Sequence, residues 1–126
     1  MKNFKKLKVW EKARQIAIDV YRFSDTLERQ QTFTFSSQIT RAALSIPSNI
    51  AEGSSKRSEK DYYRFLEFSL GSAFELETQL DIMKELEIGD TDIIKNIMDE
   101  VNEIQRMLYG LMNSLSKANG VLATDG

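Results

Sequence analysis

The sequence predicts an all-α protein, an antiparallel up-down-up-down four-helix bundle. Only one proline and six glycines occur in 126 residues, so long helices can form. Apolar residues recur at helical spacing through four segments, and short polar or glycine-containing stretches separate them. We expect one domain over residues 1–126, with helices at about 7–27, 35–52, 59–88 and 91–117.

The first two helices are predicted from apolar stripes. Ile16, Val20, Phe23 and Leu27 recur every three or four residues, and the polar residues 28–32 are predicted to form the first loop. The second stripe consists of Ile39, Ala43, Ile46 and Ile50. Pro47 lies inside this stripe, whose phase continues across it, so the sequence predicts one helix kinked at Pro47. Gly53 is predicted to end that helix.

Capping residues place the last two helices. Ser58 is a predicted N-cap with Asp61 three residues later, and Gly89 is predicted to end the third helix. Asp90 or Thr91 would cap the fourth helix. Its stripe alternates by three and four residues, as in a coiled coil: Ile94, Ile97, Val101, Ile104, Leu108, Leu111 and Leu115.

Some apolar residues exceed what one bundle seam needs: Trp10, Leu44, Phe68 and Phe74. They either widen the core face of each helix or pack against a neighbouring subunit.

Charge is distributed unevenly along the chain. Residues 1–64 carry 13 Lys and Arg against 7 Asp and Glu, whereas residues 65–126 carry 4 against 12. In the predicted topology the start of the first helix, the end of the second and the start of the third meet at one pole. This pole collects the candidate phosphate-binding residues Lys5, Lys6, Lys8, Lys12, Lys56, Arg57, Lys60 and Arg64.

Two interpretations of this pole stay open. It could bind RNA or DNA phosphates, with Trp10, Tyr62 and Tyr63 near enough to stack on bases. Alternatively, a lysine-rich end keeps a bundle soluble, and the overall pI of about 5.2 argues against strong nucleic-acid affinity for a monomer. Identical subunits packed side by side in one direction would add their basic poles together.

Composition argues against catalysis. With no His and no Cys, the commonest general base, the thiolate nucleophile and the usual transition-metal ligands are missing. No P-loop spacing is present. We therefore expect no enzyme activity, no catalytic residues, no metal and no cofactor. The sequence also has no membrane-length apolar run and no signal-peptide pattern, so we expect a cytoplasmic protein without membrane contact.

The segment RAALSIPSNIAEGSSKRS, Arg41 to Ser58, resembles the signature of the 23S ribosomal RNA intervening-sequence protein family, a bacterial-type family of four-helix bundles. The opening LKVWEKA and the later pairs Phe65-Leu66 and Gly71-Ser72 are also similar to the family pattern. We expect structural roles for the signature residues Arg41, Pro47, Asn49, Glu52, Gly53 and Gly71.

The resemblance implies a homo-oligomeric ring, a pentamer, and supplies no catalytic residues. A related branch is similar to the nucleic-acid-binding accessory proteins of diversity-generating retroelements, from which this acidic chain departs. Two hypotheses follow. The first is a non-enzymatic oligomeric bundle that binds RNA or DNA through its basic pole as an accessory to another protein. The second is a protein-interaction scaffold without a nucleic-acid role.

Overall fold

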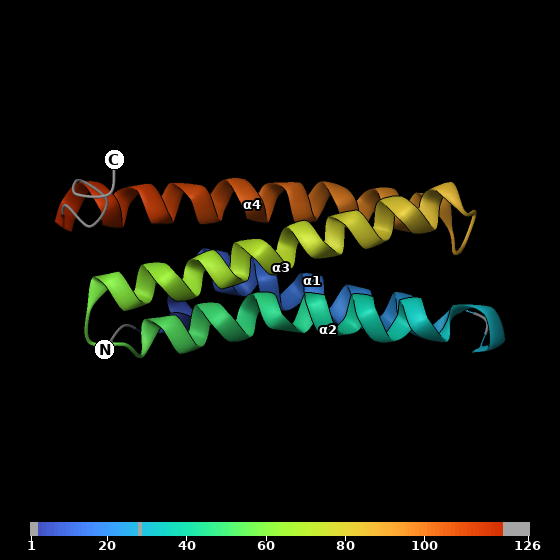
Figure 1. Ribbon diagram of the computed structural model, residues 1–126, viewed down its shortest axis with the longest axis horizontal. Coiled ribbons are helices and arrows are strands. Elements are labelled where there is room, and N and C mark those ends of the chain that lie inside the picture. Colours follow the sequence, from blue (N-terminus) through green and yellow to red (C-terminus); the bar gives the residue numbers. More distant parts are fainter. Residues whose placement is uncertain (1–2, 28, 120–126) are drawn as a thin grey trace.

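Four long helices run antiparallel in the order up, down, up, down in the computed structural model, which describes residues 3–27 and 29–119 (Figure 1). A short 3-10 helix precedes them. The elements are the 3-10 helix η1 (Phe4–Lys6), α1 (Lys8–Asp25), α2 (Arg29–Ser54), α3 (Glu59–Glu85) and α4 (Thr91–Asn119).

Each long helix packs against two neighbours. Helices α1 and α3 both contact α2 and α4. The α2–α3 contact is the most extensive and the α1–α4 contact the least. The N-terminal end of α1 and the α2–α3 connection lie at one end of the bundle, and the α3–α4 connection lies at the other (Figure 1). The predicted fold class is confirmed.

The core consists of the predicted apolar stripes. Ile39, Ala43, Ile46 and Ile50 of α2 have no exposed surface. The stripe of α4 is also buried apart from Leu111, which is half-buried. Burying aliphatic side chains of this size contributes roughly 1.5–3 kcal/mol each, so these stripes are the main source of stability.

Helix α2 begins at Arg29, about six residues earlier than predicted. The prediction of a loop at residues 28–32 was wrong for residues 29–32, which are helical, and residue 28 lies outside the described residues. Polarity was taken as a loop signal there, but the stretch contains no Gly or Pro to stop a helix. The helix before it already ends at Asp25, where the Thr26 hydroxyl donates to the Phe23 carbonyl at 2.7 Å.

Pro47 lies inside the unbroken α2, as the continuing phase of the stripe predicted. The kink itself stays a prediction. Hydrogen bonds near the proline fasten α2 to α3. The buried Ser69 hydroxyl of α3 donates to the Ile46 carbonyl at 2.9 Å, and the Ser45 and Ser72 hydroxyls lie 2.7 Å apart.

The prediction that Gly53 follows the end of α2 was wrong. Gly53 lies inside the last turn of that helix. A Cβ at this position would lie 2.8 Å from the Cβ of Phe65 and 3.1 Å from Cδ1 of Tyr62, both in α3. The absence of a side chain is therefore required by the close approach of two helices and not by a left-handed turn.

Helix α3 ends at Glu85, three residues before the predicted end. The Glu87 and Ile88 amides donate to the carbonyls of Lys84 and Met83, the hydrogen-bond pattern of a Schellman motif. Glu87 occupies the left-handed position of that motif with φ of 58°. The prediction that Gly89 terminates the helix was wrong. Glycine is required there because φ is +84° and a Cβ would lie 2.6 Å from the Phe23 ring.

Two predicted N-caps are confirmed. The Ser58 hydroxyl accepts from the Asp61 amide at 3.0 Å at the start of α3. The Asp90 carboxylate accepts from the amides of Asp92 and Ile93 at the start of α4. These bonds satisfy amides that the first turn of a helix leaves without partners.

The surplus apolar residues divide into two groups. Trp10 is half-buried, packs against the core and meets the Phe4 ring edge-on at 5.1 Å. Leu44, Phe68 and Phe74 are 62%, 48% and 43% exposed. The wide-core interpretation is therefore wrong for these three side chains within a single chain.

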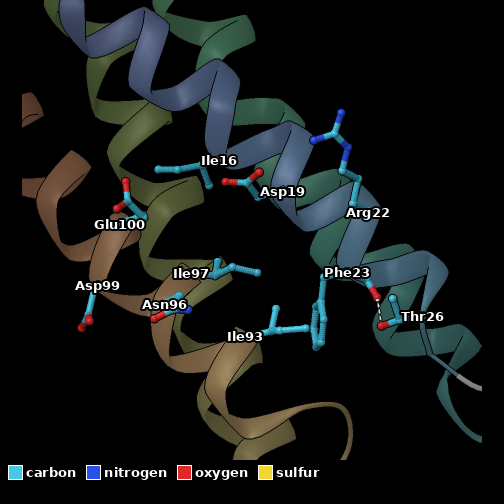
Figure 2. A pocket seen from close by; sticks show the side chains of 10 residues that line it. All are labelled: Ile16, Asp19, Arg22, Phe23, Thr26, Ile93, Asn96, Ile97, Asp99 and Glu100. Atoms are coloured by element: carbon cyan, nitrogen blue, oxygen red, sulfur yellow. Dashed lines mark hydrogen bonds between the residues drawn. The ribbon is translucent and has the colours of Figure 1, made fainter.

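An outer cleft lies between α1 and α4, toward the end of the bundle that holds the α3–α4 connection (Figure 2). Of the neighbouring long-helix pairs, these two helices have the least extensive contact. Among the described residues, no helix is both long enough and apolar enough to cross a bilayer.

Gly53→Ala should lower the free energy of unfolding by about 1–2 kcal/mol. The new methyl would overlap the Cβ of Phe65, which is fixed to the α3 backbone and can move only if the helices separate. Gly110→Ala is the matched control, because a Cβ at Gly110, which lies inside α4, meets nothing within 4 Å. This control should gain about 0.5–1 kcal/mol from helix propensity. Chemical denaturation of both variants checks the pair, and destabilisation of the same size in both would contradict the account.

Glu87→Gly should raise the free energy of unfolding by about 1 kcal/mol, or the melting temperature by roughly 2–5 °C, because glycine adopts the left-handed conformation without strain. Glu85→Gly controls for loss of a carboxylate near the same helix end. Residue 85 is helical, so this substitution should destabilise by about 0.5–1 kcal/mol. Thermal melts that move the same way for both variants would contradict the assignment.

Candidate nucleic-acid interface

Seven basic side chains from three segments share one end of the bundle, which we call the basic pole. The antiparallel topology places η1 and the start of α1 beside the end of α2 and the start of α3 (Figure 1). The basic pole consists of Lys5, Lys6, Lys8, Lys56, Arg57, Lys60 and Arg64.

The connection that carries Lys56 and Arg57 is short and capped on both sides. On the α2 side, the hydroxyls of Ser54 and Ser55 donate to the carbonyls of Ala51 and Glu52. On the α3 side, Ser58 caps the next helix. The two cations are therefore held between two fixed helix ends and not on a long loop.

Aromatic rings orient two of the cations. The Lys56 ammonium lies 4.8 Å from the centre of the Phe65 ring, and the Arg64 guanidinium lies 5.3 Å from it. Each cation–π contact contributes about 0.5–1 kcal/mol at an exposed site. Arg64 also lies 3.7 Å from the Asp61 carboxylate, an exposed ion pair that offsets part of its charge.

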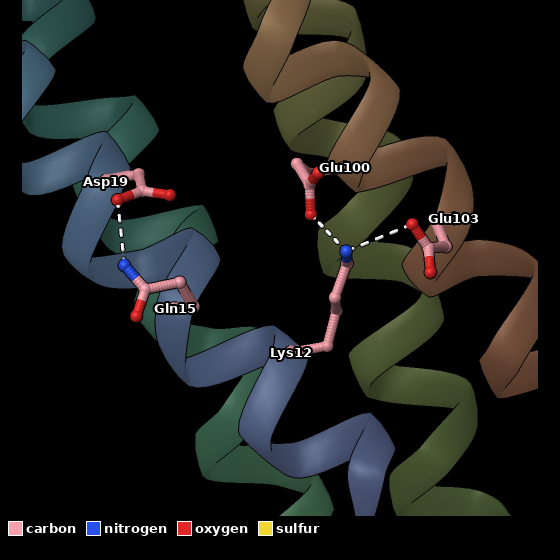
Figure 3. A network of polar contacts seen from close by, with 5 residues as sticks. All are labelled: Lys12, Gln15, Asp19, Glu100 and Glu103. Atoms are coloured by element: carbon pink, nitrogen blue, oxygen red, sulfur yellow. Dashed lines mark hydrogen bonds and ion pairs between the residues drawn. The ribbon is translucent and has the colours of Figure 1, made fainter.

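Lys12 does not join the basic pole, although the sequence placed it there. Its ammonium pairs with the carboxylates of Glu100 and Glu103 on α4, the second at 3.0 Å (Figure 3). Hydrogen bonds to Glu100 and then Glu103 raise the pKa of Lys12 above its ordinary value. Lys12 therefore links α1 to α4, and we leave it out of the phosphate-binding set.

Burial limits the two tyrosines near the pole as platforms for stacking on bases. Tyr62 is 2% exposed and belongs to the core. Its burial, and secondarily the charge of Glu59, raise the pKa of its phenol. Tyr63 is half-buried, and burial likewise raises its pKa. The expectation of base stacking by Tyr62 was wrong, because helical phase places it with Leu66 and Ser69 on the core face.

The pole keeps a net positive charge after its own carboxylates are counted. Seven basic side chains stand against Glu11, Glu52, Glu59 and Asp61, which leaves +3. The opposite end carries the carboxylates of Glu85, Glu87, Asp90 and Asp92 around Lys84. A polyanion approaching the bundle would therefore be oriented toward the basic pole.

The signature residues fall into two structural groups. Asn49 and Gly53 lie at or near the α2–α3 contact, and Asn49 donates from its amide to the Ser45 carbonyl at 2.8 Å. The buried Pro47 instead lies on the side of α2 that faces Trp10 and Ala17 of α1. Arg41, Glu52 and Gly71 are exposed. Exposed positions are not needed to pack a single bundle, so this second group is available for contact with another molecule.

Besides the ion pairs of Lys12, sequence reasoning missed three interhelical hydrogen bonds. Two join α2 to α3, Ser45 with Ser72 and Ser69 with the Ile46 carbonyl, and the third runs from the buried Gln105 amide to the Glu77 carboxylate at 2.7 Å. The available signal was a polar residue at a core-facing helical position, such as Ser69. Across residues 3–27 and 29–119, no three carboxylates gather into a group that could hold a metal ion.

Comparisons with known proteins agree with this architecture. A family model described as 23S rRNA-intervening sequence protein matches residues 5–110. A crystal structure of a protein of unknown function from the S23 ribosomal protein family of Bacteroides thetaiotaomicron is 27% identical. The match covers 82% of this chain and 97% of that chain, with a TM-score of 0.78. No curated protein matches. The chain belongs to the 23S rRNA-intervening sequence protein family.

Proposed function

We propose that this protein is a non-enzymatic, oligomeric helical bundle that binds RNA or DNA through its basic pole. One observation carries the proposal: seven basic side chains from segments far apart in sequence meet at one end. The absence of His and Cys from the sequence supports a non-enzymatic role. The family name, which refers to 23S rRNA, favours RNA as the first nucleic acid to test.

The chemistry of the pole suits phosphates and not base edges. Lysine and arginine neutralise backbone phosphates and release counterions, which makes such binding strongly dependent on salt. Phosphate contacts fix the position of a protein but read no sequence. Because Tyr62 is buried and Tyr63 is half-buried, we propose binding with little sequence preference.

Assembly would strengthen this binding. The exposed side chains of Leu44, Phe68 and Phe74, and the open backbone at Gly71, suit contact with a second copy. If subunits assemble as a ring with poles aligned, charges of +3 per subunit add together. A pentamer, the ring that the family resemblance implies, would present roughly +15 on one face.

A protein-interaction scaffold is the second candidate. The same exposed apolar side chains favour it, because they bind protein and not phosphate. The two candidates differ in whether nucleic acid binds at all.

Arg57→Glu with Lys60→Glu should weaken binding to a structured RNA by at least about tenfold at low salt. It should also reduce the slope of log affinity against log salt by about 2 per engaged subunit, because two phosphate contacts are lost. Binding across a salt series, with oligomer mass recorded in each buffer, measures both effects.

The matched control is Lys84→Glu with Lys95→Glu, which makes the same charge change at exposed residues near the opposite end of the bundle. Its affinity should stay within about threefold of the parent protein. Equal losses in both variants would show that only net charge matters. No binding by the parent protein at low salt would leave the scaffold as the better proposal.

A further inference from the structure

The cleft between α1 and α4 has the size and lining of a binding site. Its volume is about 500 Å³, within the range of ligand pockets. Ile16, Phe23, Ile93 and Ile97 supply its apolar surface from both helices (Figure 2). It lies away from the basic pole, so the proposed function leaves it unused.

Only one residue of this apolar lining is exposed. Ile16, Phe23 and Ile97 contribute to the core and are at most 5% exposed, but Ile93 at the cleft is 37% exposed. Lys12 links the two helices through Glu100 and Glu103, on the side of the cleft toward the basic pole. Beyond that link, the α1–α4 contact is not extensive enough to close the groove.

Three carboxylates, those of Asp19, Asp99 and Glu100, border the cleft, together with the Arg22 guanidinium. Because Lys95 and Lys12 pair with two of them, the surplus of negative charge around the rim comes from Glu103 and the adjacent α3–α4 connection. Asp19 accepts from the Gln15 amide at 2.9 Å, and Asp99 pairs with Lys95 at 3.0 Å. The α4 wall already holds one ammonium, that of Lys12, between Glu100 and Glu103 (Figure 3). The nearby α3–α4 connection adds Glu85, Glu87, Asp90 and Asp92.

We propose that this cleft binds a basic amphipathic helical segment of a partner protein. A groove between two helices fits the apolar face of a third helix, and the acidic rim pairs with Lys or Arg beside that face. The cleft extends along α1 from Ile16 to Thr26, about 15 Å, so it accommodates roughly ten residues or three turns.

The charge of the rim separates this partner from nucleic acid. Phosphates would be repelled by the surplus carboxylates of the adjacent α3–α4 connection, Glu85, Glu87, Asp90 and Asp92. The described helices of this chain bury their own apolar stripes in the bundle, so the occupant comes from another molecule. The two ends of the protein would then bind partners of opposite charge.

The probe is a synthetic peptide of about twelve residues, with Leu at positions i, i+3, i+4 and i+7 and Lys elsewhere. A second peptide carries Glu in place of every Lys. Fluorescence anisotropy with the full chain should show that the Lys peptide binds at least about tenfold more tightly than the Glu peptide. Ile93→Gln should weaken binding of the Lys peptide by about threefold or more, because the peptide loses an apolar contact with the exposed Ile93 side chain.

The double variant Asp19→Lys with Asp99→Lys reverses the charge of these two rim residues. It should weaken binding of the Lys peptide by about tenfold and strengthen binding of the Glu peptide. Glu67→Lys with Glu75→Lys is the matched control on exposed positions of α3, and it should leave both affinities within about twofold. Circular dichroism verifies that every variant is folded.

Three results would overturn the proposal. Equal losses in the rim and control variants would mean general attraction to an acidic protein. Equal affinity for the two peptides would mean that the rim recognises no charge. Self-association in light scattering that disappears on rim reversal would assign the cleft to a second copy of this chain.

Discussion

The position of the basic pole depends on the close contact between α2 and α3. Gly53 lets the last turn of α2 approach Phe65 and Tyr62, and Ser69 and Ser72 fasten α3 to α2 further along. This contact aligns the end of one helix with the start of the next, so the connection can be short and capped. Phe65, which packs against Gly53, also holds the cations of Lys56 and Arg64 over its ring. One packing constraint therefore serves both the fold and the candidate site.

The bundle divides its surface by charge. Basic side chains gather where α2 passes into α3, and carboxylates gather at the opposite end and along the α1–α4 cleft. Lys12 lies between these regions, and its ammonium forms ion pairs with Glu100 and Glu103. Under our two proposals, the protein would hold a phosphate backbone at one end and a basic protein segment on another face. Both roles suit an accessory protein that joins two other molecules, which is how we interpret this member of the family.

Helical periodicity predicted most of the fold, because burying an apolar stripe dominates the stability of a bundle. Residue spacing alone predicted the apolar stripes of α2 and α4. It also indicated the N-caps at Ser58 and Asp90. The errors occurred where tertiary contacts decide. Gly53 and Gly89 resemble helix-ending residues in sequence, yet Gly53 is required by α3, and Gly89 follows a cap made by Glu87. The topology predicted that the basic residues gather at one end of the bundle. It did not predict that Lys12 is ion-paired or that Tyr62 is buried, because both depend on the geometry between helices.

Lysine footprinting in the presence of a structured RNA tests the central claim most directly. Amine acetylation followed by mass spectrometry reports each lysine separately, and the chain offers lysines at both ends. The account predicts that RNA protects Lys5, Lys6, Lys8, Lys56 and Lys60 and leaves Lys84 and Lys95 as reactive as in the free protein. Uniform protection, or protection centred on Lys84 and Lys95, would contradict a basic pole that binds nucleic acid.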